Sequence, residues 1–267
     1  MNGSPPPAET SAFRSFWEWT GDHLPPFFDA PSTRFYRDCE IRLFETYFPV
    51  LKGKKIFKTD LWDEAKNTRI LAWAAEREAE VYGIDISRSI ARSARGSLAA
   101  AGRPAGFLVS DARSIGVASG AFDYLYSMGT IEHFRQYRLA LAECRRVLKP
   151  GGRAIIGVPN LFDPFLRPAM VGLLNSAGWY AYGFEKSFSA RGLERLLRGA
   201  GFRILDRTGI LFIPGWLRML DLYAYVRNRR SAAWTGPFIA PFAALSRRCP
   251  WINRYGYLVA CVAVNPG

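Results

Sequence analysis

Between residues 51 and 160 the chain alternates short apolar runs with stretches whose apolar residues recur at helical spacing. Short apolar runs bounded by polar residues are typical of buried strands, whereas the longer periodic stretches, at 68–78, 87–101 and 132–148, are typical of helices. Strands and helices that alternate in this way form βαβ units, in which helices cover both faces of a parallel sheet. We predict five strands in this region: Lys55–Thr59, Glu80–Asp85, Gly106–Ser110, Phe122–Met128 and Arg153–Pro159.

The segments on either side of this region have other patterns. Before it, several aromatic residues precede a predicted helix over 32–48. After it, a helix over 189–200 has Ser189 as its N-cap, and a strand follows at Arg203–Asp206. Tyr257–Val264 is apolar almost throughout, as expected of a final buried strand. We divide the chain into a disordered tail (1–11), a helical N-terminal arm (12–50), a core (51–160), a cap (161–254) and a final strand that completes the sheet (255–267).

Basic residues are concentrated toward the C-terminus. The chain has 36 Lys and Arg residues against 23 Asp and Glu residues, which gives a formal net charge of +13. Residues 186–254 hold 13 basic and three acidic residues, so this segment alone carries +10. Such an excess is typical of proteins that bind nucleic acid or an anionic membrane surface, and also of a solvated arginine-rich face. Because the first 185 residues are nearly balanced, we expect the two parts of the chain to have different roles.

Cysteine and histidine are too few and too dispersed to indicate metal or disulfide chemistry. The four cysteines form no CxxC pair, and the chain has two histidines. We therefore expect no metal site and no disulfide framework, and a reducing, cytoplasmic compartment. The N-terminal sequence has no basic segment followed by an apolar run, so we expect no signal peptide. The uncharged stretches are shorter than the roughly 20 apolar residues of a spanning helix, which leaves a peripheral position at the inner membrane face open.

Acidic residues follow two of the predicted strands at the point where each strand ends. Asp85 ends the second strand, and Asp111 comes directly after the third. In an open parallel sheet, ligands bind in the crevice at the carboxyl ends of the strands. Asp85 could accept hydrogen bonds from two ribose hydroxyls, and Asp111 could accept one from an adenine amino group. The alternatives are a solvated acid for Asp85 and a helix cap for Asp111.

Five sequence motifs occur in the order and spacing of a known family. They are VYGIDIS (81–87), VSDA (109–112), FDYLYSMGTIEHF (122–134), RVLKPGG (146–152) and GFEKSFSARGLERLLRGAGF (183–202). In these motifs the chain resembles class I S-adenosylmethionine-dependent methyltransferases of the type-11-like group. The resemblance implies a Rossmann-like α/β fold with a doubly wound, mostly parallel sheet of seven strands, to which the helical arm and the cap are added. It also implies S-adenosyl-L-methionine as the cofactor, bound by the core, and an acceptor selected by the arm and the cap.

The loop after the first strand departs from the pattern of this family. An acid followed by a GxGxG turn normally stands there, but Lys58 occupies the place of the acid, and no glycine lies between Gly53 and Gly83. Asn67 aligns with the final glycine, and Asn adopts the left-handed conformation more readily than most residues. Acids at 60–64 are the candidate partners of the methionine ammonium, or else a solvated helix start. This degenerate loop is either rebuilt for the cofactor or no longer binds it.

The resemblance also implies a set of site residues at the strand ends. His133 is the candidate catalytic base because histidine titrates near neutrality; its alternative role is to shape the cofactor pocket. An aromatic cluster near residue 180 is the candidate substrate site, with lid packing as the alternative. The expected cofactor-binding residues are Thr59, Asp60, Glu64, Asn67, Asp85, Ile86, Asp111, Ala112, Met128, Gly129 and Glu132, and the expected substrate-binding residues are Trp179, Tyr180, Tyr182 and Lys186.

The hypothesis that follows is methyl transfer from S-adenosylmethionine to an anionic small-molecule or lipid-linked acceptor. A methyltransferase-like protein that has lost its cofactor and an RNA methyltransferase are the alternatives. In the cap, Arg227–Arg230 and Arg247–Arg248 flank an uncharged apolar stretch at 231–246, a pattern that favours an anionic membrane surface. No nucleic-acid motif accompanies the charge, so nucleic acid is the less favoured partner. The acceptor atom and the oligomeric state stay open.

Overall fold

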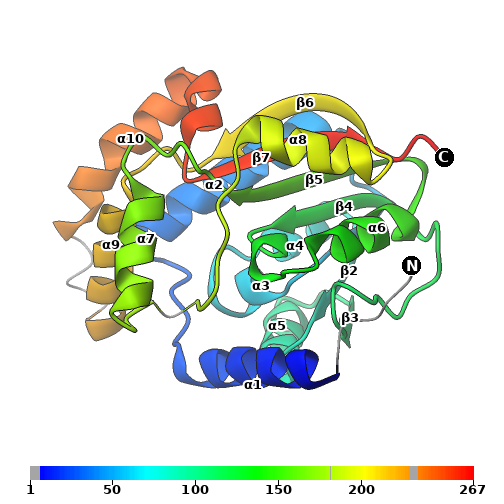
Figure 1. The fold of residues 1–267 in the computed structure, drawn as a ribbon, viewed down its shortest axis with the longest axis horizontal. Coiled ribbons are helices and arrows are strands. Elements are labelled where there is room, and N and C mark those ends of the chain that lie inside the picture. The colour runs from blue at the N-terminus through cyan, green and yellow to red at the C-terminus, as the bar shows by residue number, and fades with distance from the viewer. Residues whose placement is uncertain (1–6, 181, 229–233) are drawn as a thin grey trace.

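A sheet of seven strands forms the centre of the molecule (Figure 1). The strands are β1 (Lys55–Lys58), β2 (Glu80–Asp85), β3 (Ala105–Val109), β4 (Phe122–Met128), β5 (Leu148–Pro159), β6 (Arg203–Ile210) and β7 (Leu258–Val264). Their order in the sheet is β3-β2-β1-β4-β5-β7-β6. The first five strands are parallel, whereas β7 runs antiparallel to β5 and to β6. This topology confirms the predicted fold class. The computed structural model describes residues 7–180, 182–228 and 234–267.

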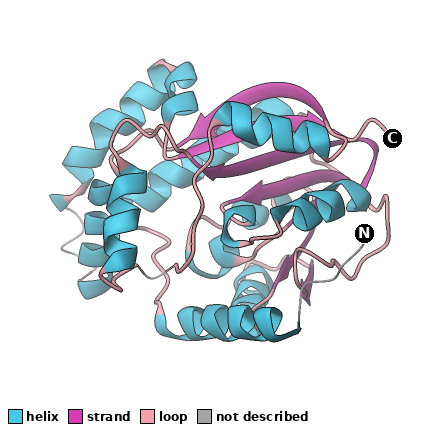
Figure 2. Cartoon of the chain, in the orientation of Figure 1, coloured by secondary structure: helices cyan, strands magenta, loops and turns pink. Residues whose placement is uncertain are grey.

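Helices cover both faces of the sheet and extend beyond one end of it (Figures 1 and 2). They are α1 (Pro7–His23), α2 (Pro31–Tyr47), α3 (Trp62–Lys66), α4 (Ile70–Ala75), α5 (Arg88–Ala100), α6 (Tyr137–Val147), α7 (Arg167–Ser176), α8 (Ala190–Gly199), α9 (Gly215–Arg227) and α10 (Gly236–Arg248), with short 3-10 turns η1 (Ile131–His133) and η3 (Pro250–Tyr255). In Figure 1, α6 and α8 lie on the near face of the sheet and α2 lies behind it, while α7, α9 and α10 gather at the left.

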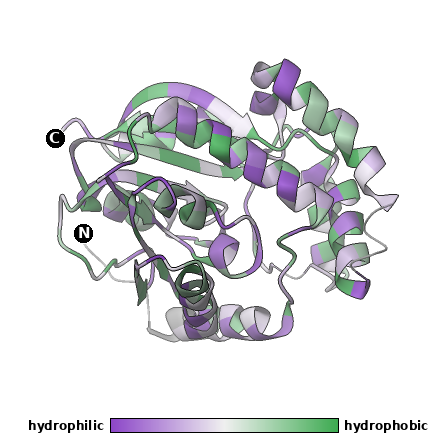
Figure 3. Ribbon diagram, turned by 180° about the vertical axis from the view of Figure 1, so that it is seen from behind, coloured by the Kyte–Doolittle hydropathy of each residue, from purple (hydrophilic) through white to green (hydrophobic). Residues whose placement is uncertain are grey.

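The sheet separates two hydrophobic layers, and β7 shows how. Every residue of this strand is buried, and successive side chains point to opposite faces of the sheet. Val259 and Cys261 join the layer that contains residues of α6 and α8, whereas Ala260 and Val262 join the layer that contains residues of α2, α4 and α5. Burial on both faces explains why this strand has no polar alternation in the sequence. The surrounding helices alternate hydrophobic and hydrophilic residues, as Figure 3 shows.

Most predicted elements occur within a few residues of their expected bounds, with two differences. The helical stretch expected at 132–148 is divided into η1 and α6. β5 begins at Leu148 instead of Arg153, so the Lys-Pro-Gly-Gly part of the RVLKPGG motif lies inside the strand, with Gly151 at φ +78°. The predicted cap of α8 is confirmed, because Ser189 Oγ accepts a hydrogen bond of 3.0 Å from the Gly192 N–H.

The N-terminal arm begins earlier than expected. Residues 7–11 belong to α1, so the prediction of a disordered tail over 1–11 is wrong for them; residues 1–6 lie outside the described residues. α1 packs beside α5, where the Glu18 carboxylate accepts hydrogen bonds from the N–H groups of Arg88 (2.6 Å) and Ser89 (3.0 Å). A carboxylate is favoured at a helix N-terminus, where the backbone N–H groups have no partner within the helix. This contact fixes α1 across the edge of the sheet at which the parallel strands end.

Among the described residues, no helix has both the length and the apolar content needed to cross a membrane. The basic and apolar stretch that connects α9 to α10 lies partly outside the described residues, including Arg229 and Arg230.

Candidate functional site

A cavity opens at the carboxyl ends of β1, β2 and β4, where the strand order reverses. The loops after these strands line its floor, and α1, α2, α9 and the segment between β5 and α8 enclose it. Open parallel sheets bind ligands at this place. Among the residues expected to bind a cofactor, those that line the cavity are Thr59, Asp60, Asn67, Asp85, Ile86, Asp111, Ala112, Met128, Gly129 and Glu132.

Glu64 is the expected cofactor residue that does not line the cavity. Its side chain is fully buried, and Glu64 Oε1 accepts a hydrogen bond of 2.9 Å from the Leu71 N–H in the first turn of α4. Glu64 therefore accepts a hydrogen bond from a backbone N–H that has no partner within the helix. The position of Glu64 in the sequence did not indicate this role.

Lys58 is the centre of a buried charge cluster at the end of β1. Its ammonium lies 2.8 Å from Asp60 Oδ1 and 2.9 Å from Asp63 Oδ2, and the side chain is inaccessible to solvent. Burial alone would lower the pKa of Lys58, but the surrounding carboxylates, Asp60 first, outweigh burial and raise it. Lys58 is therefore charged, and two carboxylates around one ammonium leave an excess of negative charge beside the cavity.

The loop that replaces the glycine-rich turn is held by side chains. Asn67 Nδ2 donates to Asp63 Oδ1 at 2.6 Å, and the Thr33 hydroxyl donates to Asn67 Oδ1 at 3.1 Å. The prediction of a left-handed backbone at Asn67 is wrong: its φ is −126°, and the left-handed residue is Arg69, at φ +58°. Arg69 is also the N-cap of α4. Hydrogen bonds from the Asn67 side chain thus fix the loop where the family uses glycine conformations.

Asp85 is buried, which excludes the alternative of a solvated strand-end acid. Its Oδ2 accepts from the Leu61 N–H at 3.0 Å and its Oδ1 accepts from the Ser87 N–H at 2.9 Å. Burial raises the pKa of Asp85 to about 7, against the opposing effect of these two backbone donors. A carboxylate has about four acceptor positions, so two remain for ligand hydroxyls.

Asp111 lines the cavity beside a cation from its own loop. Arg113 Nη2 lies 2.8 Å from Asp111 Oδ2, and Arg113 Nη1 donates to Gln136 Oε1 at 2.7 Å. No helix follows Asp111 within the described residues before η1, so the helix-cap alternative is wrong. Hydrogen bonding to a ligand adenine stays a prediction.

The opposite side of the cavity is built around Arg167. Its guanidinium forms two hydrogen bonds with the Glu185 carboxylate, of 2.5 and 2.9 Å, and the Tyr180 hydroxyl donates to Glu185 Oε2 at 2.6 Å. Arg167 and Tyr180 outweigh burial and lower the pKa of Glu185. Tyr180 and Tyr182 line the cavity, as expected of substrate residues.

Trp179 and Lys186 do not line the cavity, which contradicts the predicted substrate contacts. The Trp179 side chain is 77% exposed. The Lys186 ammonium lies over the rings of Tyr137 (5.1 Å) and Phe188 (5.3 Å), outside the site. The aromatic run thus divides between cavity wall and surface, because neighbouring residues of an irregular segment point in different directions.

His133 lies in η1 at the cavity wall, with its Nδ1 2.8 Å from the Phe184 carbonyl oxygen. A carbonyl oxygen only accepts, so Nδ1 carries the proton and Nε2 keeps its lone pair. Burial lowers the pKa of His133 and favours the neutral ring. The neighbouring Glu132 is buried, its Oε2 has no hydrogen-bond partner among the described residues, and burial followed by the charge of Glu185 raises its pKa well above the usual value.

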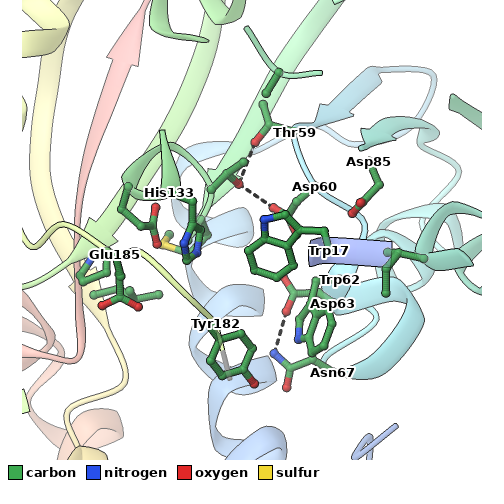
Figure 4. A pocket seen from close by; sticks show the side chains of 18 of the residues that line it. Trp17, Thr59, Asp60, Trp62, Asp63, Asn67, Asp85, His133, Tyr182 and Glu185 are labelled. Atoms are coloured by element: carbon green, nitrogen blue, oxygen red, sulfur yellow. Dashed lines mark hydrogen bonds between the residues drawn. The ribbon is translucent and has the colours of Figure 1, made fainter. Parts of the chain in front are cut away.

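Several lining residues were not expected from the sequence. Trp17 of α1 contacts the His133 ring at a centroid distance of 5.0 Å and the Trp62 ring at 6.3 Å, and Figure 4 shows its indole in front of Asp60. The aromatic content of residues 12–30 was a signal that the arm packs onto the core, but nothing in the sequence indicated where. Further residues of this kind include Phe13, Tyr36, Arg167, Glu185, Arg218 and Tyr257.

Residues 65–156 match the family described as "Methyltransferase domain". A ubiquinone biosynthesis O-methyltransferase from Mesorhizobium japonicum is 29% identical over 54% of this chain and 60% of its own length. An O-methyltransferase, cnsE, from Penicillium expansum is 35% identical over 50% of this chain and 47% of its own length. The chain thus spans about half to 60% of the length of these relatives.

Solved structures show the same fold at low sequence identity. A Burkholderia thailandensis 1,6-didemethyltoxoflavin-N1-methyltransferase, solved with its substrate and S-adenosylhomocysteine, has a TM-score of 0.57 and 15% identity over 98% of this chain and 91% of its own. The [4+2]-cyclase SpnF has a TM-score of 0.56 and 20% identity over 84% of this chain and 80% of its own.

The fold and the cavity together define an α/β protein with a ligand site at the carboxyl ends of parallel strands. With the match of residues 65–156 to a methyltransferase domain, these features are similar to those of class I S-adenosylmethionine-dependent methyltransferases.

The buried cluster around Lys58 makes a prediction about stability. We expect Lys58→Met to lower the free energy of unfolding by about 3–5 kcal/mol at pH 8, because it leaves buried carboxylates without a counter-charge. Burial raises the pKa of Asp60, and the loss of Lys58 removes the charge that opposes this effect, so the folded state binds more protons than the unfolded chain and its stability rises as pH falls toward 5. Urea unfolding at both pH values measures the effect.

Lys52→Met is the matched control, because Lys52 forms an exposed ion pair with Glu78. Such pairs contribute roughly 0–1 kcal/mol. A Lys58 variant no less stable than this control, or one whose deficit grows on acidification, would contradict the assignment.

Proposed function

We propose that this chain transfers a methyl group from S-adenosylmethionine to a small-molecule or lipid-linked acceptor. The observation that carries the proposal is one cavity, at the strand ends, that is lined by Asp60, Asp85 and Asp111 together with Gly129. The family match and the O-methyltransferase names of the relatives support it.

The charges of the site fit this cofactor despite the missing glycines. The negative excess around Lys58 suits an ammonium group, with Asp60 and Asp63 as its acceptors. The two free acceptor positions of Asp85 suit ribose hydroxyls, and Asp111 and Ala112, which line the same cavity, are our candidates for contact with the adenine. When bound, the cofactor would supply an electrophilic methyl group. The residues around it position the acceptor and exclude water, as the aromatic side chains Trp17, Trp62 and Tyr182 are placed to do (Figure 4).

An oxygen acceptor suits His133 best. A hydroxyl must lose its proton as the methyl group is transferred, and a neutral imidazole with a free Nε2 can take it. The hydrogen bond to the Phe184 carbonyl fixes the required tautomer. Burial raises the pKa of the neighbouring Glu132 well above its usual value, which favours the neutral form of this carboxyl beside His133.

A protein that keeps the fold without methyl transfer is the second candidate. The observation that favours it is the loop itself, in which Lys58 replaces an acid and Asn67 replaces a glycine. The fold also occurs in a protein named as a [4+2]-cyclase. Cofactor binding separates the proposed methyltransferase from a protein that has lost its cofactor, and methyl transfer separates it from a protein with a cyclase-like activity.

We expect the chain to bind S-adenosylhomocysteine, and Asp85→Asn to weaken this binding at least tenfold at pH 8, because Asp85, with a pKa of about 7, is then a charged acceptor for two hydroxyls that the variant lacks. Isothermal titration calorimetry measures both dissociation constants. Asp123→Asn is the control, since Asp123 lies at the opposite end of β4 and accepts from the Lys55 N–H. No binding by the unchanged protein at millimolar S-adenosylhomocysteine would refute the cofactor proposal.

We expect His133 to titrate below pH 6.5, because burial disfavours its charged form. The chain has two histidines, so NMR titration of the imidazole signals, assigned with a His23→Gln variant, measures this directly. We also expect His133→Gln to slow methylation of catechol, used as a model acceptor, by about 100-fold or more, with S-adenosylhomocysteine binding unchanged. A midpoint above pH 6.5 would contradict the expected pKa of His133, and full activity of the variant would exclude the base role.

The cap carries a surface that fits a membrane. On α9, Trp216, Leu220, Tyr223 and Val226 are exposed and recur every three or four residues, so they form one solvent-facing stripe. Large exposed apolar residues also occur on α7 and α10, which lie beside α9 in Figure 1. Apolar residues flanked by arginines favour an anionic lipid surface, and we propose that the cap binds one there.

We expect the protein to sediment with vesicles of phosphatidylcholine and phosphatidylglycerol, and the triple variant of Arg227, Arg247 and Arg248 to glutamine to bind them at least tenfold more weakly, since each basic residue near the surface contributes about 1 kcal/mol. The same change at Arg88, Arg92 and Arg103, on or next to α5, is the control. Salt-sensitive retention on RNA without vesicle binding would favour the RNA alternative instead. Vesicle binding that survives the additional loss of Arg229 and Arg230 would refute the electrostatic role.

A further inference from the structure

Arg218 of α9 is a buried cation at the cavity wall without a carboxylate partner among the described residues. Its side chain is 7% exposed, and its one hydrogen bond to a described residue runs from Nη1 to Ser32 Oγ at 3.2 Å. The other cations around the cavity, Lys58, Arg113 and Arg167, each form an ion pair with an acid. A buried charge without a counter-charge is costly, so the position of Arg218 points to a ligand.

The nearest acid on the same helix does not serve Arg218. Asp221 is fully buried, its Oδ2 accepts from the Ser32 N–H at 2.8 Å, and its Oδ1 accepts from the Thr235 hydroxyl. These bonds fasten α9 to the first turn of α2 and to Thr235, the N-cap of α10, and no ion pair joins Asp221 to Arg218. Asp221 thereby holds the helix that presents Arg218 to the cavity.

Two tyrosines, Tyr36 and Tyr182, line the cavity together with Arg218. The guanidinium lies 5.2 Å from the Tyr36 ring centroid, and Arg218 also acts electrostatically on Tyr182. Neither hydroxyl forms a hydrogen bond with any of the described residues. Burial raises the pKa of Tyr36 well above its usual value and that of Tyr182 to about 12, so both are protonated donors near neutral pH.

We propose that Arg218 and the hydroxyls of Tyr36 and Tyr182 form a subsite for a carboxylate. A planar guanidinium pairs with a carboxylate through two parallel hydrogen bonds, and the hydroxyls donate further ones. A phosphate dianion fits less well, because one cation faces it while Asp63 lies near Tyr36 and Glu185 lies near Tyr182. The proposal rests on the proposed function, which offers two sources of the carboxylate: the methionine part of the cofactor, or the acceptor.

The experiment compares Arg218→Gln with the unchanged protein in two arms. In the first, calorimetry measures S-adenosylhomocysteine against 5′-methylthioadenosine, which lacks the amino-acid part. In the second, NMR titration measures benzoate against benzamide. If the carboxylate belongs to the cofactor, we expect Arg218→Gln to lower the affinity for S-adenosylhomocysteine 10- to 100-fold and to leave the affinity for methylthioadenosine unchanged. If the carboxylate belongs to the acceptor, Arg218→Gln leaves the affinities for both nucleosides unchanged. It then weakens benzoate binding tenfold or more and does not affect benzamide binding.

Controls separate the subsite from folding. Arg227→Gln removes an exposed arginine from the same helix and should change neither arm, and Ser32→Ala removes the protein partner of Arg218 while keeping its charge. Arg218→Lys should recover part of the affinity. If Arg218→Gln does not fold, as judged by its thermal unfolding, Tyr182→Phe replaces it, with an expected loss of three- to tenfold for the same ligand.

Unchanged affinities in both arms would overturn the subsite. If the unchanged protein binds neither nucleoside, the proposed function fails, and the benzoate arm on the free protein still decides whether Arg218 binds a carboxylate. Benzoate binding that Arg218→Gln abolishes would then support the subsite alone.

Discussion

The ammonium of Lys58, enclosed at the end of β1 by Asp60 and Asp63, is the interaction on which the site depends. A lysine at this depth is tolerated only because its charge is compensated at close range. The two carboxylates must therefore stay beside β1, and this requirement fixes the position of the loop that contains them. Asn67 and Thr33 complete this constraint by tying Asp63 to α2. A glycine-rich turn reaches a similar place through backbone freedom, whereas this chain uses charge and side-chain hydrogen bonds.

The same cluster connects the core to the elements that surround the cavity. Asp60 Oδ2 accepts from the Thr130 hydroxyl, which joins the loops after β1 and β4. Tyr126, over whose ring Lys58 lies at 5.8 Å, donates to Glu40 of α2 at 2.8 Å. The arm and the core are thus coupled through buried polar groups as well as apolar packing. Such networks specify one arrangement because any displaced member leaves a buried partner unsatisfied.

Much of the core could be predicted from the sequence, because strands that alternate with helices leave a strong periodic signal. Once the end of a strand is predicted, the residues at the carboxyl edge of the sheet are known as well. The positions of Asp85 and Asp111 beside the cavity could be predicted in this way. The backbone conformation of Asn67 was predicted wrongly, because alignment with a glycine suggests a left-handed backbone. It gives no information on side-chain hydrogen bonds, which fix the loop in this chain. Trp179 and Lys186 were misplaced because an irregular segment has no periodicity that tells inside from outside. Arg218 was hidden in a basic segment, and only the fold brings it to Tyr36, far away in the chain.

A structure of the protein with S-adenosylhomocysteine bound tests the central claim most directly. We expect the ligand ammonium within hydrogen-bonding distance of the Asp60 or Asp63 carboxylate, with the Lys58 ion pairs intact and the ribose hydroxyls on Asp85. A ligand ammonium remote from both carboxylates, or a loop that must break the Lys58 pairs to admit the ligand, would contradict the view that this charge cluster replaces the glycine-rich turn.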